Sequence, residues 1–180
     1  MEDAQVITLV RNGETDAFSE IVEHYQKPIG RYLYQMTGDY ELSKDLLQDT
    51  FIKAYQSILK TNADISFKAW LYKIATNIAL QHKRRRKKIS FIPLFDDSVD
   101  LHNFVIDNSG DHFEEKLAIA EILLKIPQEQ RVCMILHFVE GFKYREIAVV
   151  LDISEEAVRK RVARGSKEFK RLYGKTGGEK

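Results

Sequence analysis

The residues best suited to chemistry lie near the C-terminus, where basic side chains recur at helical spacing. Between residues 155 and 172, an apolar stripe repeats every three or four positions and comprises Val158, Val162, Gly165, Phe169 and Leu172. The rest of this helix surface is mostly cationic and carries Glu156, Arg159, Lys160, Arg164, Lys167, Lys170 and Arg171. One packed stripe beside one basic face is typical of a helix that enters the major groove of duplex DNA.

A short apolar helix and a tight turn precede this basic helix. Residues 143–151 predict the short helix, with a packed face formed by Tyr144, Ile147, Ala148 and Leu151. Residues 152–154 predict the turn, and the Ser154 hydroxyl is expected to cap the basic helix. We interpret the segment as a helix-turn-helix. A helical hairpin with a solvated basic face would give the same pattern, so that alternative stays open.

The first two turns of the basic helix predict contacts with base edges. A carboxylate can accept a hydrogen bond from cytosine, and an arginine can donate two to guanine. The expected base contacts are those of Glu156, Arg159, Lys160 and Arg161. Phosphate contacts, which position the protein without specifying sequence, are expected from Arg164, Lys167 and Lys170.

A second basic helix is predicted over residues 66–88, with Ser66 as its N-cap. Its buried stripe is expected to comprise Phe67, Leu71, Ile74 and Ile78. The other faces show Lys68, Trp70, Tyr72, Lys73, Thr76, Asn77 and Gln81, and six cations follow at residues 83–88. Aromatic and amide groups among cations suit single-stranded nucleic acid with unstacked bases. Alternatively, Trp70 and Tyr72 belong partly to the core and the cations only solubilise the helix end.

The pattern of residues 41–60 predicts a helix with one acidic face. Leu47, Phe51, Ala54, Tyr55 and Ile58 form the expected inward stripe, and Asp45, Gln48, Asp49, Ile52 and Gln56 lie opposite. An exposed isoleucine among carboxylates favours a protein contact. Two carboxylates one turn apart, without a neighbouring histidine, do not make a convincing metal site. We therefore expect neither a metal nor another cofactor.

No enzyme signature accompanies these surfaces. The histidines lack metal-ligand spacing, and neither a glycine-rich phosphate loop nor a nucleophile elbow is present. The single cysteine, Cys133, excludes an internal disulfide and is expected to be a small core residue. A small nuclease, the remaining enzymatic alternative, would need a carboxylate cluster that binds a metal.

The overall pattern predicts an all-α protein with two small domains. The chain has 180 residues, only three prolines and nine glycines, and apolar residues at helical spacing. Further helices are expected at about 3–12, 15–37 with a bend or split at Pro28, 112–125 and 127–140. Residues 89–115 contain no Lys or Arg and seven acids, although the net charge is +1. The predicted divisions are a first domain at 1–89, an acidic linker at 90–112, a second domain at 113–174 and a tail at 175–180.

The sequence also indicates where the protein resides. No apolar run approaches the roughly 20 residues that cross a bilayer. The acidic N-terminus lacks the pattern of a secretory signal. We expect a cytoplasmic protein without direct membrane insertion.

Six short stretches together carry a family resemblance. They are residues 16–18 with Tyr25, 45–51, 67–71, 74–77, 126–127 with Arg131, and 140–148. In this order and spacing, the chain resembles the extracytoplasmic-function (ECF) group of bacterial RNA polymerase sigma factors over nearly its whole length. The resemblance implies a dissociable subunit of transcription initiation, not an enzyme. The alternative is a stand-alone helix-turn-helix transcriptional regulator.

The resemblance also implies partners and site residues. The first domain would bind the clamp helices of the largest subunit of core RNA polymerase through Asp45, Gln48, Asp49 and Ile52. The melted non-template strand of the −10 element would contact Asn62, Asp64, Lys68, Trp70, Tyr72, Lys73, Thr76, Asn77, Gln81, Arg84 and Arg85. The second domain would bind the flap of the second subunit and the −35 duplex, through Lys143, Tyr144, Glu156, Arg159, Lys160, Arg161, Arg164 and Lys167. An anti-sigma factor would cover these surfaces.

Three departures from the family pattern concern promoter choice. Gln81 stands where the family usually has Asp, and Asp152 stands where Gly is usual in the turn. The basic helix begins with Glu155 and Glu156, whereas a Gly-Thr pair is common there. The promoter sequences of relatives therefore cannot be transferred to this chain.

Overall fold

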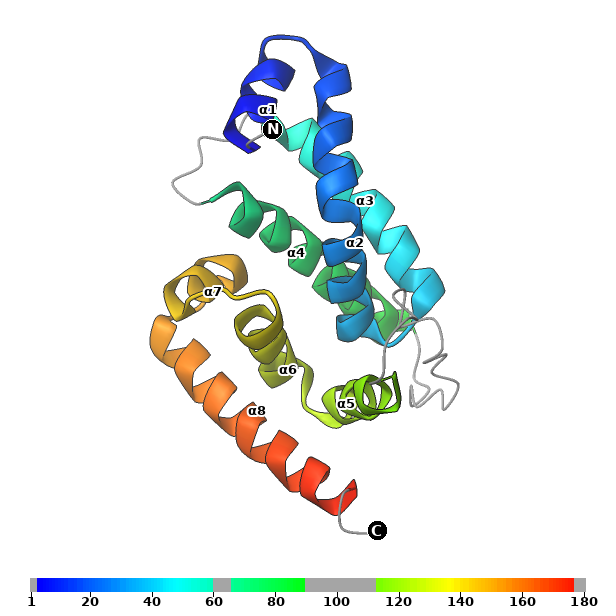
Figure 1. The fold of residues 1–180 in the computed structure, drawn as a ribbon, viewed down its shortest axis with the longest axis vertical. Helices are drawn as coiled ribbons and strands as arrows, with labels where there is room; N and C mark the ends of the chain where they lie inside the picture. The colour runs from blue at the N-terminus through cyan, green and yellow to red at the C-terminus, as the bar shows by residue number, and fades with distance from the viewer. Residues whose placement is uncertain (1–2, 60–65, 90–112, 177–180) are drawn as a thin grey trace. The chain divides into compact units, whose positions relative to one another are not determined.

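The computed structural model describes residues 3–59, 66–89 and 113–176, and these residues are almost entirely helical (Figure 1). The all-α prediction is confirmed. The chain divides into two compact units, one of residues 1–33 and 41–93 and the other of residues 34–40 and 94–180. The predicted linker, residues 90–112, lies outside the described residues, so its limits stay a prediction. None of the helices described here is long and apolar enough to cross a membrane.

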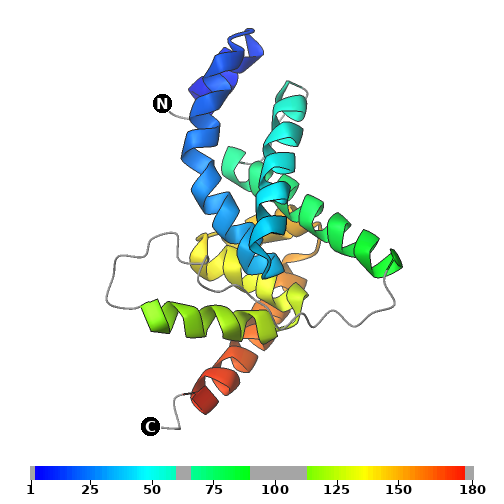
Figure 2. The ribbon, with the colours of Figure 1, turned by 90° about the vertical axis from the view of Figure 1, so that its right-hand side faces the viewer.

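The first unit contains the four N-terminal α-helices and one short 3-10 helix, except for residues 34–40, the last turn of α2 and the first residue of α3, which belong to the second unit. They are α1 (Asp3–Arg11), a 3-10 turn η1 (Thr15–Ala17), α2 (Phe18–Thr37), α3 (Tyr40–Ile58) and α4 (Phe67–Ile89). α2 and α3 run side by side in opposite directions (Figure 2). They pack closely, since a Cβ atom added to Gly30 of α2 would lie 3.6 Å from Leu47 Cδ2 of α3. Of the bend or split expected at Pro28, the split is excluded, because α2 continues through the proline as one helix. The Ala69 amide donates to Ser66 Oγ at 3.3 Å, which confirms the predicted cap of α4.

The core of this unit uses a different face of α4 from the one predicted. Its buried residues are Ala69, Leu71, Tyr72, Ala75, Thr76 and Ala79, whereas Phe67, Ile74 and Ile78 are only half-buried. On α3, the buried residues include Leu46, Phe51, Ala54 and Ile58, and the predicted inward residues Leu47 and Tyr55 are not buried. Small side chains on α4 allow close packing against neighbouring helices, which apolar periodicity alone does not reveal.

The second unit contains the helix-turn-helix. Its elements are α5 (Phe113–Lys125), α6 (Gln128–Met134), a π-helical segment η3 (Ile135–Val139), α7 (Tyr144–Leu151) and α8 (Glu155–Thr176). Pro127 is the N-cap of α6 instead of its first residue. The apolar stripe of α8 is confirmed at Val158 and Val162, which are buried. Phe169 and Leu172 pack against a cluster formed by Leu123, Ile126 and Met134.

The turn between α7 and α8 is set by two residues. Asp152 has φ +54°, a left-handed conformation that Gly adopts freely and that, among residues with a side chain, Asn and Asp adopt most readily. Its amide donates to the Ala148 carbonyl and closes α7. Ser154 Oγ accepts a hydrogen bond from the Ala157 amide at 3.1 Å and caps α8, as predicted.

Candidate functional site

The outer surface of α8 presents the predicted DNA-binding cations. Glu156, Arg159, Lys160, Arg164 and Lys167 are all exposed. Arg159 and Lys160 each form an ion pair with a glutamate one turn earlier, as Arg159 Nη2 lies 3.3 Å from Glu155 Oε1 and Lys160 Nζ lies 2.7 Å from Glu156 Oε1. The surface can therefore offer both cations and carboxylates to a partner.

Arg161 does not share this surface. Its side chain is 30% exposed, and its guanidinium Nη2 lies 2.9 Å from Glu129 Oε2 on α6. The assignment of Arg161 to the base-reading face is thus corrected: its ion pair links α8 to α6.

The start of α7 is held by contacts that the sequence reasoning missed. His137 Nδ1 lies 3.0 Å from the Phe142 carbonyl oxygen, and the His137 ring centroid lies 4.6 Å from that of Tyr144. Glu146 Oε2 accepts the Lys143 amide hydrogen at 2.8 Å. Lys143 is exposed and Tyr144 half-buried, so both predicted contact residues lie at a fixed helix start. The hydrogen bond of His137 to a carbonyl five residues later was not readable from residue spacing.

On α4, the predicted nucleic-acid residues separate into two groups. Asn77, Gln81, Arg84 and Arg85 are exposed, and Lys68, Trp70 and Lys73 are partly exposed. Tyr72 and Thr76 are fully buried, with exposed fractions of 0%. Their predicted place on the outer face is wrong, because they pack against Tyr32 of α2. The predicted residues Asn62 and Asp64 lie outside the described residues.

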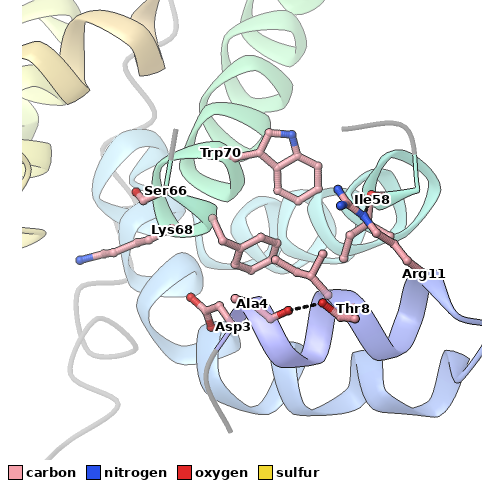
Figure 3. Close-up of a pocket in the computed structure, with 10 residues that line it drawn as sticks. Asp3, Ala4, Thr8, Arg11, Ile58, Ser66, Lys68 and Trp70 are labelled. Atoms are coloured by element: carbon pink, nitrogen blue, oxygen red, sulfur yellow. Dashed lines mark hydrogen bonds between the residues drawn. The ribbon is translucent and has the colours of Figure 1, made fainter. Parts of the chain in front are cut away.

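A pocket of about 460 Å³ lies beside the first turn of α4 (Figure 3). Arg11 and Thr8 from α1, Ile58 from α3, and Phe67 and Trp70 from α4 are among its lining residues. Arg11 Nε donates to the Ile58 carbonyl at 3.3 Å and so joins α1 to the end of α3. The pocket combines aromatic rings with cationic groups, a combination that suits a planar base attached to phosphate.

The acidic face of α3 is exposed as predicted. Asp45, Gln48 and Asp49 are exposed, and Ile52 is 49% exposed. Tyr55 and Leu59, at 41% and 62% exposed, extend this surface toward the end of α3. An apolar row beside carboxylates is typical of a surface that binds another protein.

No group of three or more His, Cys, Asp or Glu side chains in the described ranges is placed to hold a metal ion.

Comparisons with known proteins agree with this arrangement. Residues 21–89 match Sigma-70 region 2, and residues 116–169 match Sigma-70 region 4, so the two regions together cover more than half of the chain. The ECF RNA polymerase sigma factor SigW of Bacillus subtilis is 26% identical over 174 residues, covering 92% of this chain and 93% of that protein. The ECF RNA polymerase sigma-E factor of Escherichia coli strain K12 is 29% identical over 182 residues, covering 91% and 90%.

Solved structures show the same fold. The sigma factor RpoE of Bartonella quintana, in complex with the anti-sigma factor NepR, matches with a TM-score of 0.69 and 20% identity, covering 87% of this chain and 96% of that one. CnrH, in complex with the cytosolic domain of CnrY, matches with a TM-score of 0.70 and 21% identity, covering 96% and 97%. With both sigma-70 regions present in order, the chain belongs to the ECF group of RNA polymerase sigma factors.

Proposed function

We propose that this sigma factor binds core RNA polymerase as a dissociable subunit, recognises the −35 and −10 promoter elements and nucleates DNA melting. The observation that carries the proposal is that each unit presents its own exposed basic helix, α4 in the first and α8 in the second. Two modest binding surfaces fit a subunit that reads a promoter only when the polymerase holds both. Such a subunit acts in the cytoplasm.

The exposed face of α3 is the proposed contact with the clamp helices of the largest polymerase subunit. Asp45, Gln48 and Asp49 supply charge and hydrogen bonds, which steer association. Ile52, with Tyr55 and Leu59 beyond it, supplies apolar area that becomes buried in a complex. The flap of the second subunit is the proposed partner of the second unit.

The outer face of α4 is the proposed contact with the −10 element. Asn77 and Gln81 offer amides to base edges, and Arg84 and Arg85 offer charge to the backbone. Trp70, which borders the pocket in Figure 3, supplies a flat surface on which an unstacked base can lie. Together these groups favour the open strand over the closed duplex, so they would stabilise a melted −10 element.

The helix-turn-helix is the proposed reader of the −35 duplex. The first two turns of α8 would meet base edges, and Arg164 and Lys167 would meet phosphates. Lys143 and Tyr144 at the start of α7 would fix the register on the backbone. The matched structures of RpoE and CnrH are complexes with anti-sigma factors or a cytosolic partner domain, and an anti-sigma factor is likewise the proposed regulator here.

A competition experiment with core polymerase tests the proposed contact on α3. Labelled wild-type chain is bound to bacterial core enzyme and displaced by unlabelled variants. Asp49→Arg should weaken competition by at least about tenfold, since it places a cation in a docking surface. Glu23→Arg makes the same charge reversal at an exposed position of α2 and should compete like the wild type. Equal competition by both variants would contradict the proposed contact.

A further inference from the structure

The helix α8 opens with two adjacent carboxylates, and both are held in ion pairs. Glu155 Oε1 lies 3.3 Å from Arg159 Nη2, and Glu156 Oε1 lies 2.7 Å from Lys160 Nζ. All four side chains are exposed. The end of α8 that would meet base edges therefore has no net charge from these four residues, although α8 as a whole is basic.

The following turns of α8 differ in charge. Arg164 and Lys167 are exposed, and neither forms an ion pair within the described part of the chain. The next carboxylate, Glu168, pairs with Arg171 near the end of the helix. Attraction for the DNA backbone is thus concentrated after the second turn, where phosphate contacts position the helix without reading sequence.

We propose that Glu155 and Glu156 are specificity-determining residues for −35 recognition, because they hold Arg159 and Lys160 in ion pairs that only a matching base sequence can replace. A matching duplex offers a cytosine amine to a carboxylate and a guanine edge to Arg159, so each charge that leaves its pair gains a base contact. A non-matching duplex places base acceptors or phosphates, instead of a cytosine amine, opposite these carboxylates, and those groups repel them. The inference rests on the proposed function, since it takes α8 as the helix that reads the −35 element.

The ion pairs are weak enough for this exchange. Exposed pairs at this helical spacing contribute little to stability, so breaking them costs little when better partners are present. The carboxylates also suit the positive end of the α8 dipole. That structural role would affect folding alone and would not change the preference between two DNA sequences.

The test uses holoenzyme reconstituted from the full chain and bacterial core polymerase. One probe is a duplex promoter fragment found by run-off transcription on source-genome DNA, and the other is the same fragment with a scrambled −35 element. The apparent Kd for each probe is measured at several salt concentrations, and the ratio of the two constants reports discrimination. The variants are E155Q/E156Q and E168Q, and E168Q also removes one charge from an ion pair on α8 but lies outside the reading turns. Thermal unfolding checks that both variants fold.

The expected results separate a sequence effect from an effect of net charge. E155Q/E156Q should bind the scrambled fragment roughly tenfold more tightly, with a salt dependence steeper by about two, because two carboxylates no longer oppose the backbone contacts. It should gain less on the promoter, so the discrimination ratio should fall by about fivefold or more. E168Q should keep the wild-type ratio.

Each contrary result has a distinct meaning. Equal ratios for the wild type and E155Q/E156Q would overturn the inference and leave the proposed function standing. An equal fall for E168Q would also overturn it, because net charge alone would then explain the change. A wild-type holoenzyme that binds both fragments equally would contradict the −35 role of α8 itself, and the inference with it.

Discussion

The hydroxyl oxygens of Tyr32 on α2 and Thr76 on α4 lie 2.6 Å apart in the core of the first unit. Thr76 Oγ1 also donates to the Tyr72 carbonyl at 2.7 Å, so the Tyr32 hydroxyl is the donor to Thr76. Both residues are fully buried. A side chain that we predicted at the DNA surface thus joins two helices instead, and its neighbour Asn77 takes the exposed position.

Substitution of these two neighbours should separate stability from promoter opening. Thr76→Val keeps the shape but removes both hydrogen bonds, and it should lower the free energy of unfolding by about 1–3 kcal/mol. Asn77→Ala should change that free energy by less than about 0.5 kcal/mol, since the residue is exposed. Urea unfolding followed by circular dichroism measures both values.

In transcription, Asn77→Ala should have the larger effect and Thr76→Val the smaller one. Asn77→Ala should reduce open-complex formation by holoenzyme, because it removes an amide from the proposed −10 surface. Thr76→Val, at a temperature where it remains folded, should reduce it less. A stability loss for Asn77→Ala as large as that for Thr76→Val would contradict the placement of these side chains.

Gly165 provides a second test of packing, at the crossing of α6 and α8. A Cβ atom there would meet Met134 Sδ and would lie 3.1 Å from Met134 Cγ and 3.2 Å from Gln130 Cβ. Gly165→Ala should therefore lower the free energy of unfolding by about 1 kcal/mol or more, since overpacking outweighs the gain in helix propensity.

Gly174 is the matched control on the same helix. A Cβ atom at Gly174 has no neighbour within 4 Å, so Gly174→Ala should be neutral or stabilise by up to about 1 kcal/mol. Thermal or urea unfolding of both variants gives the comparison. Stabilisation by Gly165→Ala equal to that by Gly174→Ala would be inconsistent with a close crossing of α6 and α8.

Cys133 should be chemically silent in the folded protein. Burial raises the pKa of its thiol to about 11, although the nearby Arg161 guanidinium acts in the opposite direction. At pH 8 the thiol is therefore almost entirely protonated as well as inaccessible, and only a thiolate reacts readily with disulfide reagents. Native protein should react with such a reagent at least about 100 times more slowly than protein in urea. Rapid reaction of the native protein would argue against a buried Cys133.

The surroundings of Tyr25 predict that the folded protein loses stability at alkaline pH. Its hydroxyl donates to Asp3 Oδ2 at 2.6 Å, and burial first, followed by this hydrogen bond and the Asp3 charge, raises the pKa of Tyr25 well above its usual 10.0. The folded state holds the phenolic proton more tightly than the unfolded state. The stabilisation that protonated Tyr25 gives the folded protein is therefore complete below pH 10 and is lost as pH rises above 10.

Tyr25→Phe isolates that contribution. The variant should be less stable than the wild type at neutral pH, because it lacks the hydrogen bond to Asp3. The difference between the two proteins should narrow above pH 10, and urea unfolding at pH 8 and at pH 10.5 measures it. A difference that stays constant between these pH values would show that Tyr25 titrates equally in both states.

The sequence predicted the helices of this protein well where apolar residues repeat strongly. Val158 and Val162 are buried as their spacing indicated, and Ser66 and Ser154 cap their helices. These features depend on local physics, namely helical periodicity and side-chain capping, which a sequence shows directly.

The sequence failed where tertiary packing chose between two faces of one helix. On α4 the core face is formed mostly by Ala69, Tyr72, Ala75 and Thr76, which carry less apolar signal than the half-buried Ile74 and Ile78. Arg161 was misplaced for a different reason. Its long side chain reaches Glu129 on α6, and that partner is close only in the folded unit.

The most direct test of the central claim is run-off transcription by bacterial core polymerase on fragments of the source genome, with and without this protein. The account predicts new discrete transcripts that need the protein and that disappear with the double variant Asp45→Arg/Asp49→Arg. The double variant should have nearly the same circular dichroism spectrum and unfolding profile as the wild type, since both residues are exposed. Absence of any new transcript, together with binding of duplex DNA by the protein alone, would contradict the account and favour a stand-alone regulator.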